Sequence, residues 1–311
     1  MSDINLITVT GPTASGKTTF AAHLALLLQS EIISADSRQV YKKMDIGTGK
    51  DLEEYSIKGH QIPYHLINIR EPGYKYNVYE FQHDFIKPFE EIRSQNKIPI
   101  LVGGTGMYIE AVTKGYKLIN VPVDDSLRAE LEKKELEELV EQLKILKPEL
   151  HNSTDIKHKK RTIRSIEIAT YYQNHAEIDT KFPEIHQLIF GVKHDRGSRR
   201  KRISERLKTR LSSGMIEEVE QLLKTVNAED LIFYGLEYKF ITLYLAGELT
   251  RVQMQQKLEI SIHQFAKRQM TWFRKMEREG TKIYWLDGLM PLEEKLDRAK
   301  SILRLHGIAL N

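Results

Sequence analysis

The stretch "TVTGPTASGKTTF" (Thr8 to Phe20) decides the fold, because it contains a complete phosphate-binding loop. Gly11 to Thr18 match the pattern G-x-x-x-x-G-K-[ST], with an apolar strand-like run before them and the helix-like run "TTFAAHLALLLQ" after them. Glycines let successive backbone N–H groups converge on phosphate oxygens, and the N-terminus of the following helix adds a favourable dipole. The predicted phosphate-binding residues are Gly11, Thr13, Ala14, Ser15, Gly16, Lys17 and Thr18, with the Thr18 hydroxyl as a ligand of Mg²⁺.

Strand-like and helix-like segments alternate along much of the chain. The predicted strands after the first are "EIISAD", "IPILVGG" (98–104), "LIFGV" (188–192) and "KIYWL" (282–286). Such alternation predicts an α/β fold of the P-loop type, with a mainly parallel sheet and helices on both of its faces. The segment between the third and fourth of all the predicted strands, "IPILVGG" and "LIFGV", contains the charged, helix-forming run "DDSLRAELEKKELEELVEQLKIL". We predict a catalytic core with C-terminal helices from residues 1–118 and 187–311, and a helical insertion at 119–186.

The composition is typical of a globular protein from a reducing compartment. The 311 residues include no Cys, which excludes a disulfide framework and a thiolate metal site. The N-terminus lacks the pattern of a signal peptide, and no apolar run approaches the length of a membrane span. The net charge of +4 is mild, so local clusters of charge are more informative than the total. We therefore expect a cytoplasmic monomer that does not contact a membrane.

The acidic residue expected in an NTPase lies in an unusual place. Such enzymes usually have an apolar strand ending in Asp that helps to hold Mg²⁺, but "IPILVGGTG" ends in glycines and Thr105. Asp36 instead follows the second predicted strand. Because ligands bind at the carboxyl ends of parallel strands, Lys17, Asp36 and Thr105 are expected to meet in one cleft. A turn or a helix cap formed with Ser37 is the structural alternative for Asp36.

Several blocks of sequence carry a resemblance to a known family. They are, in order, "GPTASGKT", "SADSRQVYKKMDIGTGK", "PYHLINI", "IPILVGGTGMYIEAV", "RISERLKTRLSSGMIEEV" and "KRQMTWFRK". With these blocks, the chain resembles the bacterial tRNA dimethylallyltransferases (tRNA isopentenyltransferases) nearly from end to end. The resemblance implies transfer of a dimethylallyl group from its diphosphate to N6 of the adenine on the 3′ side of the anticodon. It implies the tRNA anticodon stem-loop and dimethylallyl diphosphate as partners, with Mg²⁺ as the cofactor.

The resemblance also gives the phosphate loop a different task from ATP binding. The loop would hold the departing diphosphate, whose developing negative charge Lys17, Mg²⁺ and the backbone N–H groups stabilise. Arg206, in "RISER", would add a second cation. Asp36 would accept a proton from the adenine amine, after the base has left the stack. The catalytic residues implied are Lys17, Asp36, Thr105 and Arg206, and the base pocket implied is Asp36, Ser37, Arg38, Gln39 and Thr105.

Basic residues cluster in the predicted insertion. In "IKHKKRTIRSIEI" (156–168), Lys157, Arg161 and Arg164 have the spacing of one helix face. The opposite face is apolar, so the pattern predicts an anchored helix with a basic stripe, although a solvated charged face is the plain alternative. The resemblance implies tRNA contacts at Lys160, Arg161 and Arg164, and at Arg128.

A second basic block, "AKRQMTWFRK" (266–275), contains two aromatic residues. We expect Trp272 and Phe273 to belong to the core, while the basic residues remain available to phosphates. Two features depart from the family pattern: Lys160, where many relatives have Gln, and "YGLEYKF" (234–240), in place of a block like "GYRQ". Both concern tRNA recognition. The segment "GTGK" (47–50) lacks the full loop pattern, which leaves Lys50 only as a candidate for the wall of the cleft.

The sequence leaves other functions open. A P-loop small-molecule kinase would use the same loop for ATP, and an adenylate isopentenyltransferase would prenylate AMP or ADP. A nucleotide-gated RNA-binding protein would not need Asp36. The lack of an acid after the third predicted strand argues against the kinase, and the long basic insertion argues against an acceptor as small as a mononucleotide.

Overall fold

Two compact units make up the chain. The structure, a computed structural model, describes residues 3–148, 156–175 and 182–310. The larger unit comprises Met1–Tyr116 and Pro183–Asn311, and the smaller unit comprises Lys117–Phe182. The boundaries proposed from the sequence, 119–186, lie close to this division.

Parallel strands form the sheet of the larger unit. Over the described residues the sheet has six strands in the order β5-β2-β6-β1-β7-β8, and every neighbouring pair is parallel. The strands are β1 (Leu6–Thr10), β2 (Ile32–Ser34), β5 (Tyr64–His65), β6 (Ile100–Gly103), β7 (Gln187–Lys193) and β8 (Ile283–Asp287). Every residue of the central strand β1 is buried, as expected when helices cover both faces of a sheet. The predicted mainly parallel sheet is confirmed.

Short elements between β2 and β6 were not predicted. A 3₁₀ helix, η1 (Leu52–Tyr55), leads into the antiparallel pair β3 (Ser56–Ile57) and β4 (His60–Gln61), and the edge strand β5 follows. Each of these strands is too short to produce a recognisable alternation of apolar and polar residues.

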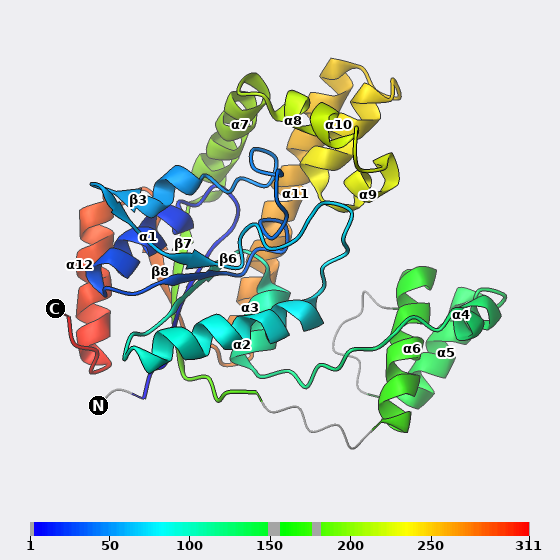
Figure 1. The fold of residues 1–311 in the computed structure, drawn as a ribbon, viewed down its shortest axis with the longest axis horizontal. Helices are drawn as coiled ribbons and strands as arrows, with labels where there is room; N and C mark the ends of the chain where they lie inside the picture. Colours follow the sequence, from blue (N-terminus) through cyan, green and yellow to red (C-terminus); the bar gives the residue numbers. More distant parts are fainter. Residues whose placement is uncertain (1–2, 149–155, 176–181, 311) are drawn as a thin grey trace. The chain divides into compact units, whose positions relative to one another are not determined.

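Helices cover both faces of the sheet, as predicted. On one face, α1 (Lys17–Leu27) and α12 (Leu292–Leu305) share an apolar cluster with the strands. On the other face lie α2 (Val78–Ser94) and α3 (Gly106–Thr113), on the lower side of the strands in Figure 1. Helix α2 begins with a capping box between Asn77 and Glu80 and buries Phe81, Phe85 and Phe89 at helical spacing.

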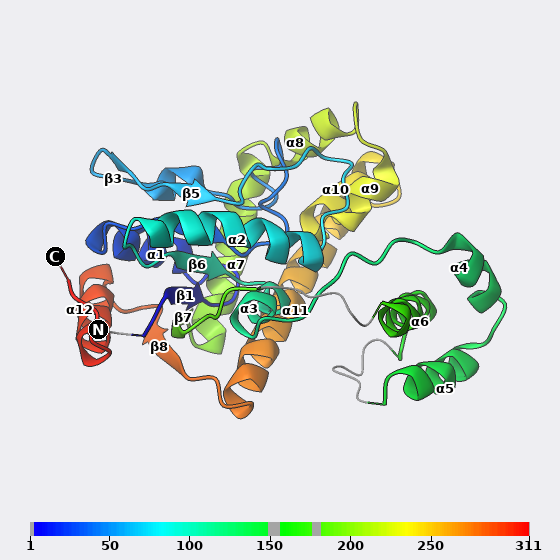
Figure 2. The ribbon, with the colours of Figure 1, turned by 60° about the horizontal axis from the view of Figure 1, so that its bottom comes forward.

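A group of helices extends the larger unit beyond the sheet. They are α7 (Arg196–Ser212), α8 (Met215–Leu222), α9 (Ala228–Phe233), α10 (Leu236–Leu245) and α11 (Arg251–Arg278). Helix α11, which has 28 residues, starts at a capping box formed by Thr250 and Gln253 and passes beside α3 (Figure 2). In the described part of the chain, no helix combines the length and apolar character needed to cross a membrane.

The smaller unit has its own core. Its helices are α4 (Asp125–Leu131), α5 (Leu136–Leu146) and α6 (Lys159–Asn174). Leu131 of α4, Leu139 of α5 and Ile163 and Ile166 of α6 are buried together. The charged run that we predicted to be helical forms two helices, α4 and α5, because a new capping box starts at Glu135.

The predicted basic stripe is partly wrong. Helix α6 begins at Lys159, so Lys157 precedes the helix and does not share a helical face with Arg161 and Arg164. The apolar side of the helix is as predicted, since Ile163 and Ile166 are buried in the core of the smaller unit.

Candidate active site

The phosphate loop connects the carboxyl end of β1 to the first residue of α1. Gly11 has φ 155°, and a Cβ atom at this position would lie 2.3 Å from the carbonyl oxygen of Val192, so a larger residue does not fit. Gly16 is the N-cap of α1 with φ 81°, in the left-handed region that glycine favours. Because Gly16 has no side chain, it leaves the helix N-terminus open to an anion.

Side chains from distant helices hold the loop in place. Gln269 of α11 accepts a hydrogen bond from the Thr13 N–H (2.9 Å) and donates one to the Gly104 carbonyl (2.9 Å). Arg202 of α7 donates from Nε to the Ala14 carbonyl oxygen at 3.1 Å. Sequence reasoning missed both residues, because Thr13 and Gln269 are 256 positions apart.

Two cations lie at the loop. Burial lowers the pKa of Lys17, and the nearby Asp36 carboxylate opposes this effect. Burial, followed by repulsion from Arg210, lowers the pKa of Arg206 to about 10, so its guanidinium is still charged at neutral pH. Nη2 of Arg206 also donates a hydrogen bond to the hydroxyl of Thr13. The loop is therefore a partly buried positive site, which favours a multiply charged anion.

Asp36 faces the same region from the end of β2. Its Oδ1 accepts a hydrogen bond from the Arg38 N–H at 2.9 Å, which is the turn that the sequence allowed as an alternative. The turn fixes the carboxylate without removing it from the cleft, since Asp36 lines the cavity and acts electrostatically on Lys17. Thr105, the N-cap of α3, accepts a weaker hydrogen bond from the Ser37 N–H at 3.4 Å.

A cavity of about 460 Å³ joins the phosphate loop to Asp36 and Thr105. This volume lies within the range of pockets that bind small molecules. The predicted site residues that line it are Thr13, Ala14, Ser15, Gly16, Lys17, Thr18, Asp36, Ser37, Arg38, Gln39, Thr105 and Arg206. Gly11 does not line the cavity. Its lack of a side chain instead allows the loop backbone to pass close to the Val192 carbonyl.

Helix α11 forms one wall of the cavity, and the sequence analysis assigned one of its residues wrongly. Phe273 is fully buried, as predicted, but Trp272 lines the cavity, so the expectation of a core position for Trp272 is wrong. A Cβ atom on Gly106 would lie 2.2 Å from the Trp272 ring, so a glycine there lets the indole lie against the start of α3. The signal was present in the sequence, because the α11 residues of the lining, Ile262, Phe265, Arg268, Gln269 and Trp272, recur at helical spacing.

The segment that departs from the family pattern forms another wall. Tyr234, Gly235, Leu236, Glu237 and Tyr238 all line the cavity. Burial raises the pKa of Glu237, against the influence of the nearby arginines. The departure in "YGLEYKF" therefore changes the surface of the cavity itself.

The oxygen atoms beside the loop fit a magnesium ion. Thr18 lines the cavity, as does Glu54, whose buried Oε2 has no hydrogen-bond partner among the described residues. Magnesium binds hydroxyl and carboxylate oxygens, and usually takes one or two protein ligands together with substrate phosphates and water. The described residues contain no group of three or more His, Cys, Asp or Glu that would enclose a metal without a substrate. Thr18 and Glu54 would therefore hold the ion jointly with a diphosphate.

Two arginines predicted to contact RNA are paired inside the smaller unit. Arg128 donates from Nε (3.0 Å) and Nη2 (2.8 Å) to the carboxylate of Glu167, which is 2% exposed. Arg164 also binds Glu167, and its Nη2 donates to the Val121 carbonyl at 2.9 Å. These contacts give Arg128 and Arg164 a structural role, which the sequence did not indicate. Lys160 and Arg161, by contrast, are exposed.

The stability of the smaller unit is expected to depend on pH through Glu167. Burial alone would raise its pKa, but hydrogen bonds from Arg128, the Asp124 N–H and Arg164 outweigh burial and hold the pKa below its usual 4.5. A carboxylate with a lowered pKa stabilises the fold above its unfolded value, and this contribution is lost as the pH falls through the folded value. We expect Glu167→Gln to cost about 2 kcal/mol near neutral pH, with a difference from wild type that shrinks below about pH 4.5.

Amide hydrogen exchange of α6 across this pH series measures the effect. Glu137→Gln, on the exposed side of α5, provides a control with the same change of charge. A destabilisation by Glu167→Gln that stays constant with pH would contradict the ion-pair explanation.

Comparison with known proteins identifies the family. The family model described as "IPP transferase" matches residues 39–276, and the family model described as "Isopentenyl transferase" matches residues 4–64. The chain belongs to the IPP transferase family. It is 58% identical over 304 residues to "tRNA dimethylallyltransferase 1" of Parabacteroides distasonis, covering 97% of this chain and 99% of the relative. It is 55% identical over 304 residues to "tRNA dimethylallyltransferase 2" of Phocaeicola vulgatus, with the same coverage.

Solved structures agree with this family. The full-length tRNA isopentenylpyrophosphate transferase of Bacillus halodurans superposes with a TM-score of 0.70 and 29% identity, over 97% of this chain and 96% of that one. A eukaryotic dimethylallyltransferase acting on tRNA superposes with a TM-score of 0.79, over 99% of this chain and 81% of that one. Its identity is 22%, so this likeness concerns the fold alone.

Proposed function

We propose that this protein transfers a dimethylallyl group from dimethylallyl diphosphate to N6 of the adenine on the 3′ side of the anticodon in tRNA, and releases diphosphate. Relatives more than half identical to this chain over nearly its whole length are named tRNA dimethylallyltransferases. One observation carries the proposal: the phosphate loop and Asp36 open into the same cavity. A leaving diphosphate and an incoming nucleobase can therefore be held together.

The bond changes follow from this arrangement. The bond between C1 of the allyl group and the diphosphate oxygen breaks, its electron pair leaves with the diphosphate, and a new bond forms between N6 and C1. The backbone N–H groups of Ala14 to Thr18 and the side chains of Lys17 and Arg206 stabilise the negative charge that develops on the leaving group. Thr18 and Glu54 would hold a magnesium ion, which would supply further positive charge beside the leaving group.

The adenine amine requires a base, because its lone pair is delocalised into the ring. We assign this role to Asp36, which accepts the N6 proton as the carbon–nitrogen bond forms. The Arg38 N–H holds Oδ1 of Asp36 and so orients the carboxylate. Ser37, Arg38, Gln39 and Thr105 line the adjoining part of the cavity, where they would contact an extruded base.

A transfer assay tests the proposal. The protein is incubated with Mg²⁺ and labelled dimethylallyl diphosphate and, in separate reactions, with tRNA, AMP or ADP; a further reaction supplies ATP with small acceptors. Label in tRNA alone is the expected result. Label in AMP or ADP would instead indicate an adenylate prenyltransferase, and phosphate transfer from ATP to a small acceptor would indicate a kinase.

Exposed cations of the smaller unit are expected to contribute to tRNA binding. Lys160→Ala combined with Arg161→Ala should weaken binding and reduce the magnitude of the slope of log affinity against log salt by about 1 to 2. The reason is that fewer counterions are released on binding when phosphate contacts are lost. Filter binding across a salt series measures the slope, with Lys133→Ala plus Lys144→Ala, also exposed in this unit, as the control. An unchanged slope would remove Lys160 and Arg161 from the RNA surface.

The same proposal concerns assembly and location. We propose a monomer that acts in the cytoplasm, where a tRNA-modifying enzyme like the named relatives would meet its substrate. Sedimentation of the protein with and without tRNA tests the first point, since a self-associated species in both samples would contradict it.

A further inference from the structure

The loop from Asp36 to Asp51 forms much of the acceptor side of the cavity, which is the part beside Asp36 where the nucleobase would lie. It contributes Asp36, Ser37, Arg38 and Gln39 at its start, and Gly47, Thr48, Gly49 and Asp51 near its end. The described elements place no helix or strand within it; its pairing with the segment after β5 includes an isolated bridge between Tyr41 and Arg70. Its shape therefore depends on side chains.

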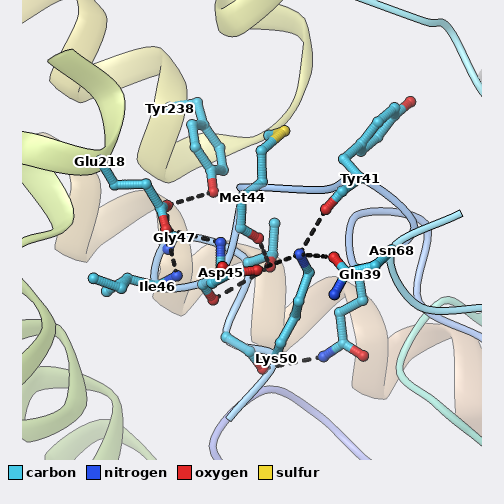
Figure 3. Close-up of polar contacts among 12 residues, drawn as sticks. Gln39, Tyr41, Met44, Asp45, Ile46, Gly47, Lys50, Asn68, Glu218 and Tyr238 are labelled. Carbon is cyan, nitrogen blue, oxygen red and sulfur yellow. Dashed lines mark hydrogen bonds and ion pairs between the residues drawn. The ribbon is translucent and has the colours of Figure 1, made fainter. Parts of the chain in front are cut away.

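Lys50 holds the loop from within (Figure 3). Its side chain is fully buried, and Nζ donates to the Tyr41 carbonyl (2.6 Å), Asp45 Oδ1 (2.5 Å) and Asn68 Oδ1 (2.5 Å). An ammonium group has three protons, so these contacts satisfy it completely. The expectation that Lys50 forms part of the cleft wall is wrong, because its charge is directed into the loop and away from the cavity lining.

The same interactions fix a residue of the predicted base pocket. The Gln39 side chain donates to the Gly49 carbonyl at 3.0 Å, and its carbonyl oxygen accepts from the Ser34 hydroxyl at 3.2 Å. The Asn68 backbone N–H donates to the Gln39 backbone carbonyl at 3.1 Å. Since Lys50 binds Asn68 and adjoins Gly49, the position of Gln39 depends on the position of Lys50.

Glu218 of α8 holds the loop from the other side (Figure 3). Its Oε2 accepts hydrogen bonds from the N–H groups of Asp45 (2.8 Å) and Ile46 (2.7 Å), and its Oε1 accepts one from Gly47 (3.0 Å). Oε1 also accepts a hydrogen bond from the Tyr238 hydroxyl at 2.8 Å. A carboxylate that accepts from several aligned N–H groups forms strong, directional contacts.

Tyr238 connects the loop to a second wall of the cavity. It lies in α10, within the segment 234–238 that lines the cavity. A Cβ atom on Gly47 would lie 2.7 Å from the Tyr238 ring, so the loop and the helix are already in close contact. Glu218 therefore joins two walls of the cavity through one carboxylate.

We propose that Glu218 and Lys50 are positioning residues for the nucleobase: they hold the loop 36–51 in the conformation that accepts the adenine of tRNA. The inference rests on the proposed function. The phosphate loop has other supports, from Gln269 and Arg202, so the diphosphate site is expected to be independent of Glu218. Neither positioning residue contacts the reacting atoms in this proposal.

Steady-state kinetics with Glu218→Gln test the proposal. A carboxamide has one acceptor oxygen and cannot receive all four hydrogen bonds, so the KM for tRNA should rise about tenfold, while the KM for dimethylallyl diphosphate changes less than about twofold. Tyr238→Phe removes one of the four donors and should give a smaller rise. Glu217→Gln, exposed on the same helix and with the same change of charge, should behave as wild type.

Lys50→Met tests the inner support, with the exposed Lys43→Met as its control. We expect a selective rise in the KM for tRNA here as well. If this variant does not fold, as thermal unfolding and circular dichroism would reveal, the Glu218 and Tyr238 variants decide the question.

The outcomes separate the inference from the proposed function. A wild-type protein that transfers no label to tRNA would contradict the function. An active wild type together with a Glu218→Gln variant whose KM for tRNA matches that of Glu217→Gln would contradict the inference. Equal losses for both substrates, or a lower melting temperature without any change in KM, would reduce Glu218 to a purely structural role and also overturn it.

Discussion

Asp36→Asn is expected to lose transfer activity by about 10² to 10⁴-fold in kcat while keeping its affinity for tRNA. The asparagine carbonyl can still accept the hydrogen bond from the Arg38 N–H, so the turn that places the side chain is preserved. The amide, however, cannot take a proton from the adenine amine at neutral pH. The variant thus removes the base and leaves its surroundings in place.

Single-turnover transfer and filter binding measure the two effects separately. Glu53→Gln, exposed on the neighbouring 3₁₀ helix, has the same change of charge and should keep wild-type activity. An Asp36→Asn protein that retains more than about a tenth of the wild-type rate would show that proton transfer to this carboxylate does not limit the reaction.

Arg206→Ala is expected to lower kcat by about 10² to 10³-fold, because it removes a charged donor from the leaving-group side. Arg206 binds the Thr13 hydroxyl and lines the cavity beside Lys17. Its pKa of about 10 keeps it charged over the pH range of an ordinary assay, so the loss should be nearly independent of pH below about 8.

Inhibition by the product gives a second readout for Arg206. Diphosphate should inhibit the Arg206→Ala protein less strongly than wild type, whereas the affinity for tRNA should be unchanged. Lys208→Ala, exposed on the same helix, is the control for charge. If Arg206→Ala and Lys208→Ala have equal rates and equal inhibition, the arginine does not act on the diphosphate.

The sequence predicts those parts of the site that depend on contiguous residues. Gly11 to Thr18 form the predicted loop because glycine positions, the preceding strand and the following helix are all local signals. Asp36 reaches the cleft because it follows a strand of a parallel sheet, whose carboxyl edge is where ligands bind. The buried strands were found for the same reason, since each is a short apolar run.

Contacts between distant segments could not be predicted in this way. Gln269 supports Thr13 across 256 positions, and Glu218 supports Asp45 across 173. Glu167 looked like one acidic residue on a charged helix, yet its buried carboxylate binds the guanidinium groups of Arg128 and Arg164. Such assignments need the packing of whole elements, because a carboxylate or an amide has no local pattern that distinguishes a buried acceptor from a solvated one.

The amide group of Gln269 has a consequence for how the two substrates influence each other. One planar carboxamide contacts Thr13 on the diphosphate side and Gly104, which precedes the α3 N-cap Thr105, on the acceptor side. A ligand that orders either rim would also order the other, so part of the entropic cost would be met before the second ligand arrives. We therefore expect the two substrates to favour each other's binding, and because linkage is reciprocal the factor would be the same in both directions.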